Sequence, residues 1–117
     1  MIEKFMYTLW YFRRLQPGDT GYREGVEMFA PPEKRRLNFR AISNEALLLS
    51  GGEFKEERLV GKQPIGSKDV YIPNDRVYIG TENPSEKFSS IAPKANYRVT
   101  SVGAGHRVVE IIMERMV

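Results

Sequence analysis

Short runs of alternating hydrophobic and polar residues recur along the chain, and turn-forming residues separate them at Pro17-Gly18, Gly51-Gly52 and Pro73-Asn74, among other places. Breakers spaced this closely leave little room for long helices. The runs between them are rich in β-branched and aromatic residues, which is typical of all-β domains. We therefore expect one domain over residues 1–117, an all-β small barrel or sandwich with two long loops and at most one short helix.

Several segments have the composition of strands. The opening run FMYTLWYFRRL also fits a helical stripe through Phe5, Met6 and Leu9, but its aromatic content favours a strand. In KRRLNFRAIS, Leu37, Phe39 and Ala41 share one face. Glycines 103 and 105 predict a hairpin between the last two runs. The predicted strands are residues 5–15, 21–30, 34–43, 69–73, 76–80, 95–102 and 106–117.

The stretch KDVYIPNDRVYIG places two brief strand-like runs around Pro73-Asn74-Asp75. This composition predicts a tight turn that the Asp75 side chain supports through a hydrogen bond. Alternation predicts that four apolar residues of the stretch face the core. They are Val70, Ile72, Val77 and Ile79.

Two polar segments read as long loops, residues 51–67 and 81–94, with weak strand character only at 58–60 in the first. Residues 44–52 form a short segment with several apolar residues that ends in a Gly pair, a pattern that predicts a helical turn. Loops longer than about 12 residues are unusual in a small domain and tend to be functional. The candidate interaction residues in these loops are Phe54, Lys55, Glu56, Glu57, Arg58, Lys87 and Phe88.

Charge adds one further candidate. The chain has a net charge of +3 and a pI of about 9.3, and its one dense basic run is EKRRLNFR. Phe39 within that run could stack on a base, as in barrels that bind single-stranded nucleic acid. A core strand with charged residues on its solvent side explains the same alternation, and mixed charge elsewhere favours an ordinary solvated surface. The candidate basic patch is Lys34, Arg35, Arg36 and Arg40.

Catalytic and cofactor chemistry find little support. The chain has no cysteine, so disulfides, thiolate nucleophiles and cysteine-ligated metals are excluded. His106 is the single imidazole, which falls short of a zinc site, and no serine lies in a nucleophile elbow. GAGHRV lacks the third glycine of a dinucleotide motif. We expect no enzyme and no cofactor. No apolar run approaches the roughly 20 residues of a membrane span, and the N-terminus does not read as a signal peptide.

The order of segments resembles the small head-tail connector proteins of tailed bacteriophages, also called head-closure, head-completion or minor capsid proteins. The resemblance rests on the aromatic opening strand YTLWYFRR, the strand RLNFRAIS and a polar glycine-bearing loop, then the Asp-x-Val strand NDRVYIG, the Tyr-x-Val strand YRVTSV and the apolar strand RVVEIIMER. It implies that the Asp-x-Val and Tyr-x-Val strands are successive members of a small barrel.

The resemblance also implies a structural function. Copies would form a ring, commonly of six or twelve, between portal-side proteins and the tail, closing the head and docking the tail. The implied partners are a second copy of this chain, a portal or adaptor protein and tail proteins, with non-specific proximity to DNA and no membrane. The implied location is the head-tail junction of the virion, assembled in the host cytoplasm. Loops 51–67 and 81–94 would then face the lumen or a partner. The alternative is a basic β-barrel that binds single-stranded nucleic acid.

Overall fold

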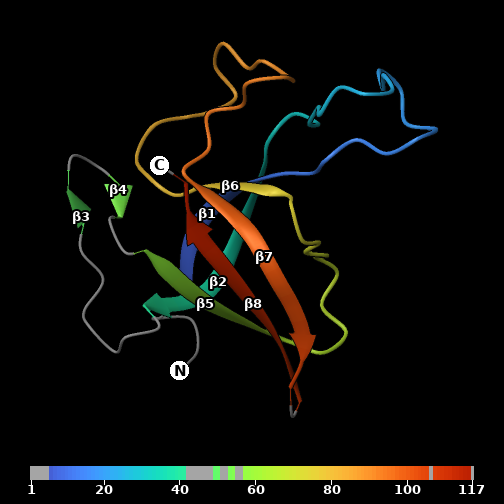
Figure 1. Cartoon of the computed structure of the whole chain (residues 1–117). Helices are drawn as coiled ribbons and strands as arrows, with labels where there is room; N and C mark the ends of the chain where they lie inside the picture. The colour runs from blue at the N-terminus through green and yellow to red at the C-terminus, as the bar shows by residue number, and fades with distance from the viewer. Residues whose placement is uncertain (1–5, 42–48, 51–52, 55–56, 106, 117) are drawn as a thin grey trace.

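A closed antiparallel barrel is the central feature of the computed structural model, which describes residues 6–41, 49–50, 53–54, 57–105 and 107–116 (Figure 1). The described residues contain no helix, so the all-β prediction and its barrel alternative are confirmed. A two-stranded sheet of β3 (Leu49–Ser50) and β4 (Glu53–Phe54) lies apart from the barrel. In barrel order the strands are β1 (Met6–Phe12), β2 (Glu33–Ala41), β5 (Arg58–Pro64), β8 (Val108–Arg115), β7 (Tyr97–Ala104) and β6 (Arg76–Tyr78), which returns to β1.

One face of each strand forms the core inside the barrel. Successive side chains of a strand point to opposite faces, so every second residue turns inward. The predicted alternation in 34–43 is confirmed for Leu37 and Phe39, which are both buried. The buried core consists of Leu9, Tyr11, Leu37, Phe39, Leu59, Tyr71, Val77, Ile79, Tyr97, Val99, Ile111 and Met113.

Gly61 lets the barrel close tightly between β2 and β5. It pairs across the strands with Phe39 and lies beneath Leu37. A Cβ atom at this position would stand only 2.5 Å from Cδ2 of Leu37, which is itself buried. Leu37 therefore fills the space that a side chain at position 61 would need.

A second apolar cluster lies outside the barrel wall. Phe12 of β1 and Tyr78 of β6 point outward, and Phe29 of the β1–β2 connection covers them. Phe88 of the β6–β7 connection stacks on Phe12 with ring centroids 6.2 Å apart. The Phe29 amide donates to the Ser90 carbonyl at 2.8 Å, which joins these two long connections on the side of the barrel where β6 lies (Figure 1).

The strand predicted at 21–30 is wrong. Gly21 and Gly25 have φ angles of 86° and 81°, in the left-handed region that glycine adopts without strain. The amides of Tyr22 and Val26 donate to carbonyls three residues earlier, so the segment is a series of turns. Only Phe29 makes a β-bridge, to Arg14.

The long loop predicted at 51–67 is also corrected. Its second half is β5, a strand that pairs with β2 on one side and β8 on the other. The weak strand signal at 58–60 marks the buried start of that strand, since Leu59 and Val60 are its apolar residues. The helical turn predicted at 44–52 falls mostly outside the described residues, and its described part, Leu49–Ser50, is β3.

The stretch around Pro73-Asn74 forms one strand and not two. Val77 and Ile79 are buried as predicted, but Val70 and Ile72 are 61% and 46% exposed, so that part of the prediction is wrong. Residues 68–73 have no strand partner, and Tyr71 between the two exposed residues enters the core instead. Residues 70–72 do alternate between core and solvent as predicted, but Tyr71 faces the core and its two neighbours face solvent.

The two last predicted strands are confirmed as β7 and β8, and the hairpin between them is present. Simple alternation fails inside β7, because the register shifts between Val99 and Ser101. After this bulge the side chains exchange faces. Val102 therefore packs against the core like Val99, although uninterrupted alternation would put the two residues on opposite faces.

Replacing Gly61 with alanine should lower the free energy of unfolding by about 1–3 kcal/mol, the usual effect of overpacking a core. The added methyl must displace Leu37, which has no free space to enter. Urea denaturation measures this directly. Gly103→Ala is the matched control, because a Cβ there meets nothing within 4 Å. Equal effects of the two variants would contradict the packing described here.

Candidate functional site

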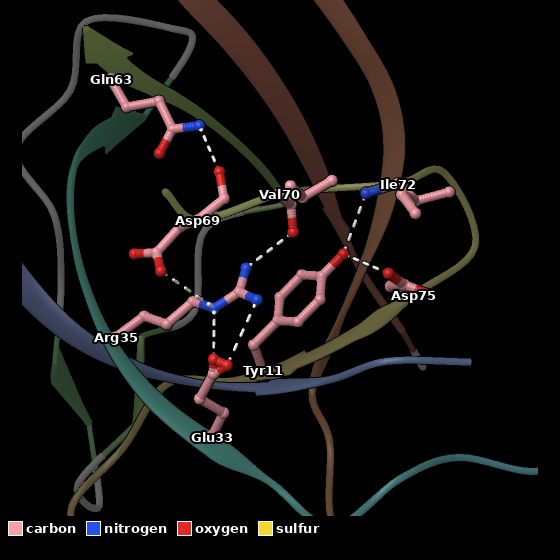
Figure 2. A network of polar contacts seen from close by, with 8 residues as sticks. All are labelled: Tyr11, Glu33, Arg35, Gln63, Asp69, Val70, Ile72 and Asp75. Carbon is pink, nitrogen blue, oxygen red and sulfur yellow. Dashed lines mark hydrogen bonds and ion pairs between the residues drawn. The ribbon is translucent and has the colours of Figure 1, made fainter. Parts of the chain in front are cut away.

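Side chains bind the backbone of residues 69–72 in the β5–β6 connection (residues 65–75), whereas β7 binds the backbone at its end. There the Asn74 amide donates to the Val99 carbonyl at 2.7 Å, and the Asp75 carbonyl accepts the Val99 amide at 3.0 Å. Figure 2 shows the side-chain contacts between the connection and the barrel. A buried or half-buried backbone group needs a hydrogen-bond partner, and an extended segment without a strand partner must find it elsewhere. The three side-chain contacts are Arg35 Nη1 to the Val70 carbonyl at 2.8 Å, the Ile72 amide to the Tyr11 hydroxyl at 2.9 Å and Gln63 Nε2 to the Asp69 carbonyl at 2.9 Å.

Arg35 occupies an inward position of β2 at the end of the barrel. Its guanidinium carbon lies 3.9 Å from the centroid of the Tyr11 ring and 4.9 Å from that of Tyr71. Its Nε lies 3.4 Å from a Glu33 carboxylate oxygen and 3.8 Å from one of Asp69. Only 9% of the side chain is exposed. The basic patch predicted from sequence therefore loses Arg35, whose charge is used inside the fold.

Asp75 is a buried carboxylate that ties the same connection to β1. Its Oδ2 accepts the hydrogen of the Tyr11 hydroxyl, and its Oδ1 accepts the Arg14 amide at 2.8 Å. Burial raises the pKa of Asp75, and the hydrogen bonds from Tyr11 and Arg14 oppose that rise. A carboxylate with a perturbed pKa can mark a functional site. Here both oxygens accept bonds from β1 and the residues after it, so its geometry is that of a structural contact.

The turn predicted at Pro73-Asn74-Asp75 is present, but its support differs from the prediction. The Asp75 amide donates to the Ile72 carbonyl at 3.1 Å, and Asn74 has a φ angle of 79°. Proline followed by a residue of positive φ is typical of a type II turn. The Asp75 side chain does not bond to the turn, because its oxygens point to β1.

The two tyrosines beside Arg35 differ in their hydroxyl groups. Burial, with the Asp75 hydrogen bond, raises the pKa of Tyr11 above its ordinary value. Burial also raises the pKa of Tyr71 to about 12, and the nearby Arg35 charge opposes this rise. The Tyr71 hydroxyl is buried, and the guanidinium lies near it without the geometry of a hydrogen bond, so among the described residues it has no partner.

The outer face of β2 carries the rest of the predicted basic patch. Lys34, Arg36 and Arg40 alternate along it and are exposed. Phe39 is buried in the core, so it does not stack on a base, and the alternative interpretation of this run, a core strand with charged residues on its solvent side, is confirmed. The aromatic residue on this face is Trp10, the cross-strand neighbour of Lys34, whose Nζ lies 5.7 Å from the ring centroid. Trp10 and Tyr11 are successive residues of a strand and so point to opposite faces, but only the register places Trp10 beside Lys34.

A hollow of about 310 Å³ lies between β2 and β5, and we call it the seam pocket. Among the described residues, the two strands pair from Asn38–Lys62 to Ala41–Leu59. Beyond that point β2 pairs only with β1, and β5 only with β8. Nothing in the sequence signalled this opening. The pocket is lined by Arg36, Leu37, Asn38, Lys62, Gln63, Pro64, Ser67 and Val108.

The candidate loop residues do not come together as one site. Arg58 begins β5 and forms an ion pair with Glu114 at 3.3 Å, while the Glu57 carbonyl accepts the Arg115 amide. Lys87 is exposed in the other long connection, where half-buried Phe88 packs on Phe12. Phe54 is part of β4. Lys55, Glu56 and His106 lie outside the described residues.

Comparisons with known proteins found no relative: no protein-family model matches the chain, and neither curated proteins nor solved structures give a significant match. Across the described ranges, no three His, Cys, Asp or Glu side chains gather in a way that could hold a metal ion. The described part of the chain also has no helix of the length and apolarity needed to cross a bilayer. Function must therefore be inferred from the surfaces described above.

Removing the Tyr11 hydroxyl should destabilise the protein far more than removing that of Tyr71. Tyr11→Phe leaves the Asp75 carboxylate and the Ile72 amide without their partner, at a cost of about 2–3 kcal/mol. Tyr71→Phe removes a hydroxyl without a partner and should change the free energy of unfolding by less than about 0.5 kcal/mol, or raise it. Denaturant titration of both variants is the measurement. A larger loss for Tyr71→Phe would contradict the network.

The raised pKa of Asp75 predicts the sign of one pH effect. Between the ordinary value of 3.8 and the raised value, the folded protein keeps a proton that the unfolded chain has released. This contribution to stability is complete below pH 3.8 and is lost as the pH rises through the folded pKa. Relative to Asp75→Asn, the wild type should therefore lose stability from about pH 4 toward neutrality. Chemical denaturation across that range tests it, and a relative gain by the wild type would show that the pKa is lowered.

Proposed function

We propose that this chain is a structural subunit of the head-tail connector of a tailed bacteriophage. Copies form a ring between portal-side proteins and the tail, which closes the head and provides the docking surface for the tail. The proposal starts from the resemblance of the strand order to that family. A barrel of this size suits such a role, because neighbouring subunits contribute buried surface and stabilise the folded form by mass action.

The exposed apolar residues of the β5–β6 connection are the observation that carries the proposal. Ile65, Val70 and Ile72 are 59%, 61% and 46% exposed, and they are three of the five large hydrophobic residues exposed among those described. A cluster of such residues on one segment is typical of a contact surface. The backbone of that segment is held by Arg35 and Tyr11, so its exposed side chains are presented without a large ordering cost.

The pairing of β6 with β7 supports the proposal as well. The resemblance implies that the Asp-x-Val and Tyr-x-Val strands are successive members of a barrel. Val77 lies opposite Tyr97 in that pair, although 81–94 intervenes as a long loop, as the sequence predicted. Because a fold alone does not determine function, the β6–β7 pairing is only secondary support for the proposal, after the exposed apolar residues.

In the proposed ring, the β5–β6 connection contacts a neighbouring copy. The long connection with Lys87 and Phe88, together with Phe54, Glu57 and Arg58, is then left for portal or adaptor proteins and for tail proteins. Packaged DNA passes through the ring. These assignments place the assembly at the head-tail junction of the virion.

The mass of the purified protein in solution, measured by light scattering over a range of concentrations, tests the ring. The wild type should rise with concentration toward a hexamer or dodecamer. Val70→Asp/Ile72→Asp should weaken self-association at least about tenfold, because charges would be buried in an apolar contact. Val26→Asp/Ile91→Asp is the matched control, since these residues are equally exposed elsewhere and should leave association unchanged.

Two results would contradict the proposal. One is a wild type that stays monomeric at all concentrations and also on purified portal complexes. The other is equal loss of association in the control variant, which would show that charge anywhere on the surface has this effect. The position of the gene is an independent check, because a connector gene should lie among portal, capsid and tail genes.

A further inference from the structure

The seam pocket has the two chemical features of a site for a phosphorylated ligand. Its apolar lining comes from Leu37, Pro64 and Val108, which are contributed by three different strands. Its volume of about 310 Å³ falls at the lower end of the range for small-ligand pockets. Positive charge lies at its edge on Arg36 and Lys62, which come from the two strands that separate.

Positive charge continues from the pocket along the outer face of β2. Arg36 lies opposite Thr8 and Lys34 lies opposite Trp10 on β1, so hydroxyl and aromatic groups alternate with cations on this surface. Neither Lys34 nor Arg36 forms an ion pair with a carboxylate among the described residues, and both are exposed. The face therefore offers cations to an external anion.

Acidic neighbours limit this charge on one side only. Glu110 of β8 lies 3.8 Å from Lys62, and Glu114 lies 3.3 Å from Arg58, so the β5–β8 surface is balanced. Glu33, the acidic residue of β2, points to the opposite side and contacts Arg35. The unbalanced cations thus form a strip that runs from Lys34 over Arg36 into the mouth of the seam pocket.

We propose that this strip and the seam pocket bind a single strand of nucleic acid, with phosphates along Lys34 and Arg36 and one base in the pocket. Cations at alternate positions of a strand, on one face, suit the repeating phosphates of a backbone, whereas an apolar pocket beside them suits a flat base. An acidic peptide matches the cations but leaves the apolar lining unused. The inference does not depend on the connector function.

Trp10 provides a built-in probe of this face. It is the only tryptophan of the chain, and the Lys34 ammonium lies over its ring. A phosphate that draws Lys34 away changes the surroundings of the indole. Titration of the full chain with an oligothymidylate of about ten nucleotides, followed by tryptophan fluorescence, should therefore give a saturable signal.

Two variants separate the strip from the pocket. Lys34→Gln/Arg36→Gln should weaken binding about tenfold and reduce the dependence of log K on log salt by about 1.4, at about 0.7 for each single-strand phosphate contact. Ser67→Tyr places a ring in the pocket from an exposed position. It should weaken binding about tenfold, the effect of losing one bound base, and leave the salt dependence unchanged.

Arg23→Gln/Arg98→Gln is the matched control for charge. Both residues are exposed on other parts of the surface, and this variant also removes two positive charges. It should bind like the wild type. Thermal unfolding of each variant is measured as well, and a loss of binding is interpreted only for variants that are folded.

Each other outcome overturns the proposal. Absence of binding by the wild type removes it outright. Equal losses in the control variant, or equal competition by polyglutamate, would show only non-specific attraction to polyanions. Equal affinity for duplex DNA, or unchanged binding by Ser67→Tyr, would show that no base enters the pocket. Affinity for a free mononucleotide as high as for the oligonucleotide would make this a small-ligand site. A failed ring measurement leaves all of these results unaffected.

Discussion

The hydrogen bonds of Tyr11 determine how the β5–β6 connection lies on the barrel. A single hydroxyl donates to the Asp75 carboxylate and accepts the Ile72 amide, so one side chain of β1 fixes both ends of the segment that carries Ile72. Arg35 adds a bond to the Val70 carbonyl from β2. With these contacts in place, Tyr71 fills the core and its neighbours face solvent. The surface proposed for self-association is a direct consequence.

The same connection explains why the barrel wall opens between β2 and β5. At Pro64 the chain leaves β5, and proline has no amide hydrogen to donate to a strand. The Gln63 side chain bonds to the Asp69 carbonyl of the connection, and residues 64–67 form a turn closed by the Ser67 amide and the Pro64 carbonyl. Strand β2 therefore continues with β1 as its only partner, and the space left between β2 and β5 is the seam pocket. One segment thus shapes both surfaces to which we assign binding.

The sequence allowed the all-β fold, the last hairpin and the core face of 34–43 to be predicted, because alternation and turn residues act locally. The prediction failed mainly where a contact between distant residues decides which side chain is buried. Val70 and Ile72 alternate like core residues, but the bond from Ile72 to Tyr11, 61 residues away, selects Tyr71 for the core. Alternation puts Arg35 on the face of Leu37 and Phe39, but no local pattern indicates that a cation is accepted there. Distant partners, among them Asp69 and the rings of Tyr11 and Tyr71, accommodate its charge. The seam pocket depends on where pairing stops, which no local pattern records.

Hydrogen exchange at the Ile72 amide tests most directly whether side chains hold the β5–β6 connection. This amide has no strand partner, so the Tyr11 hydroxyl is the group that protects it. The account predicts protection comparable to that of the Val99 amide, which donates from β7 to the Asp75 carbonyl at the end of the connection. Exchange of Ile72 at the rate of an unstructured peptide, while Val99 stays protected, would contradict it. Residues 69–72 would then be loosely held, and the surface proposed for self-association would not be fixed in place.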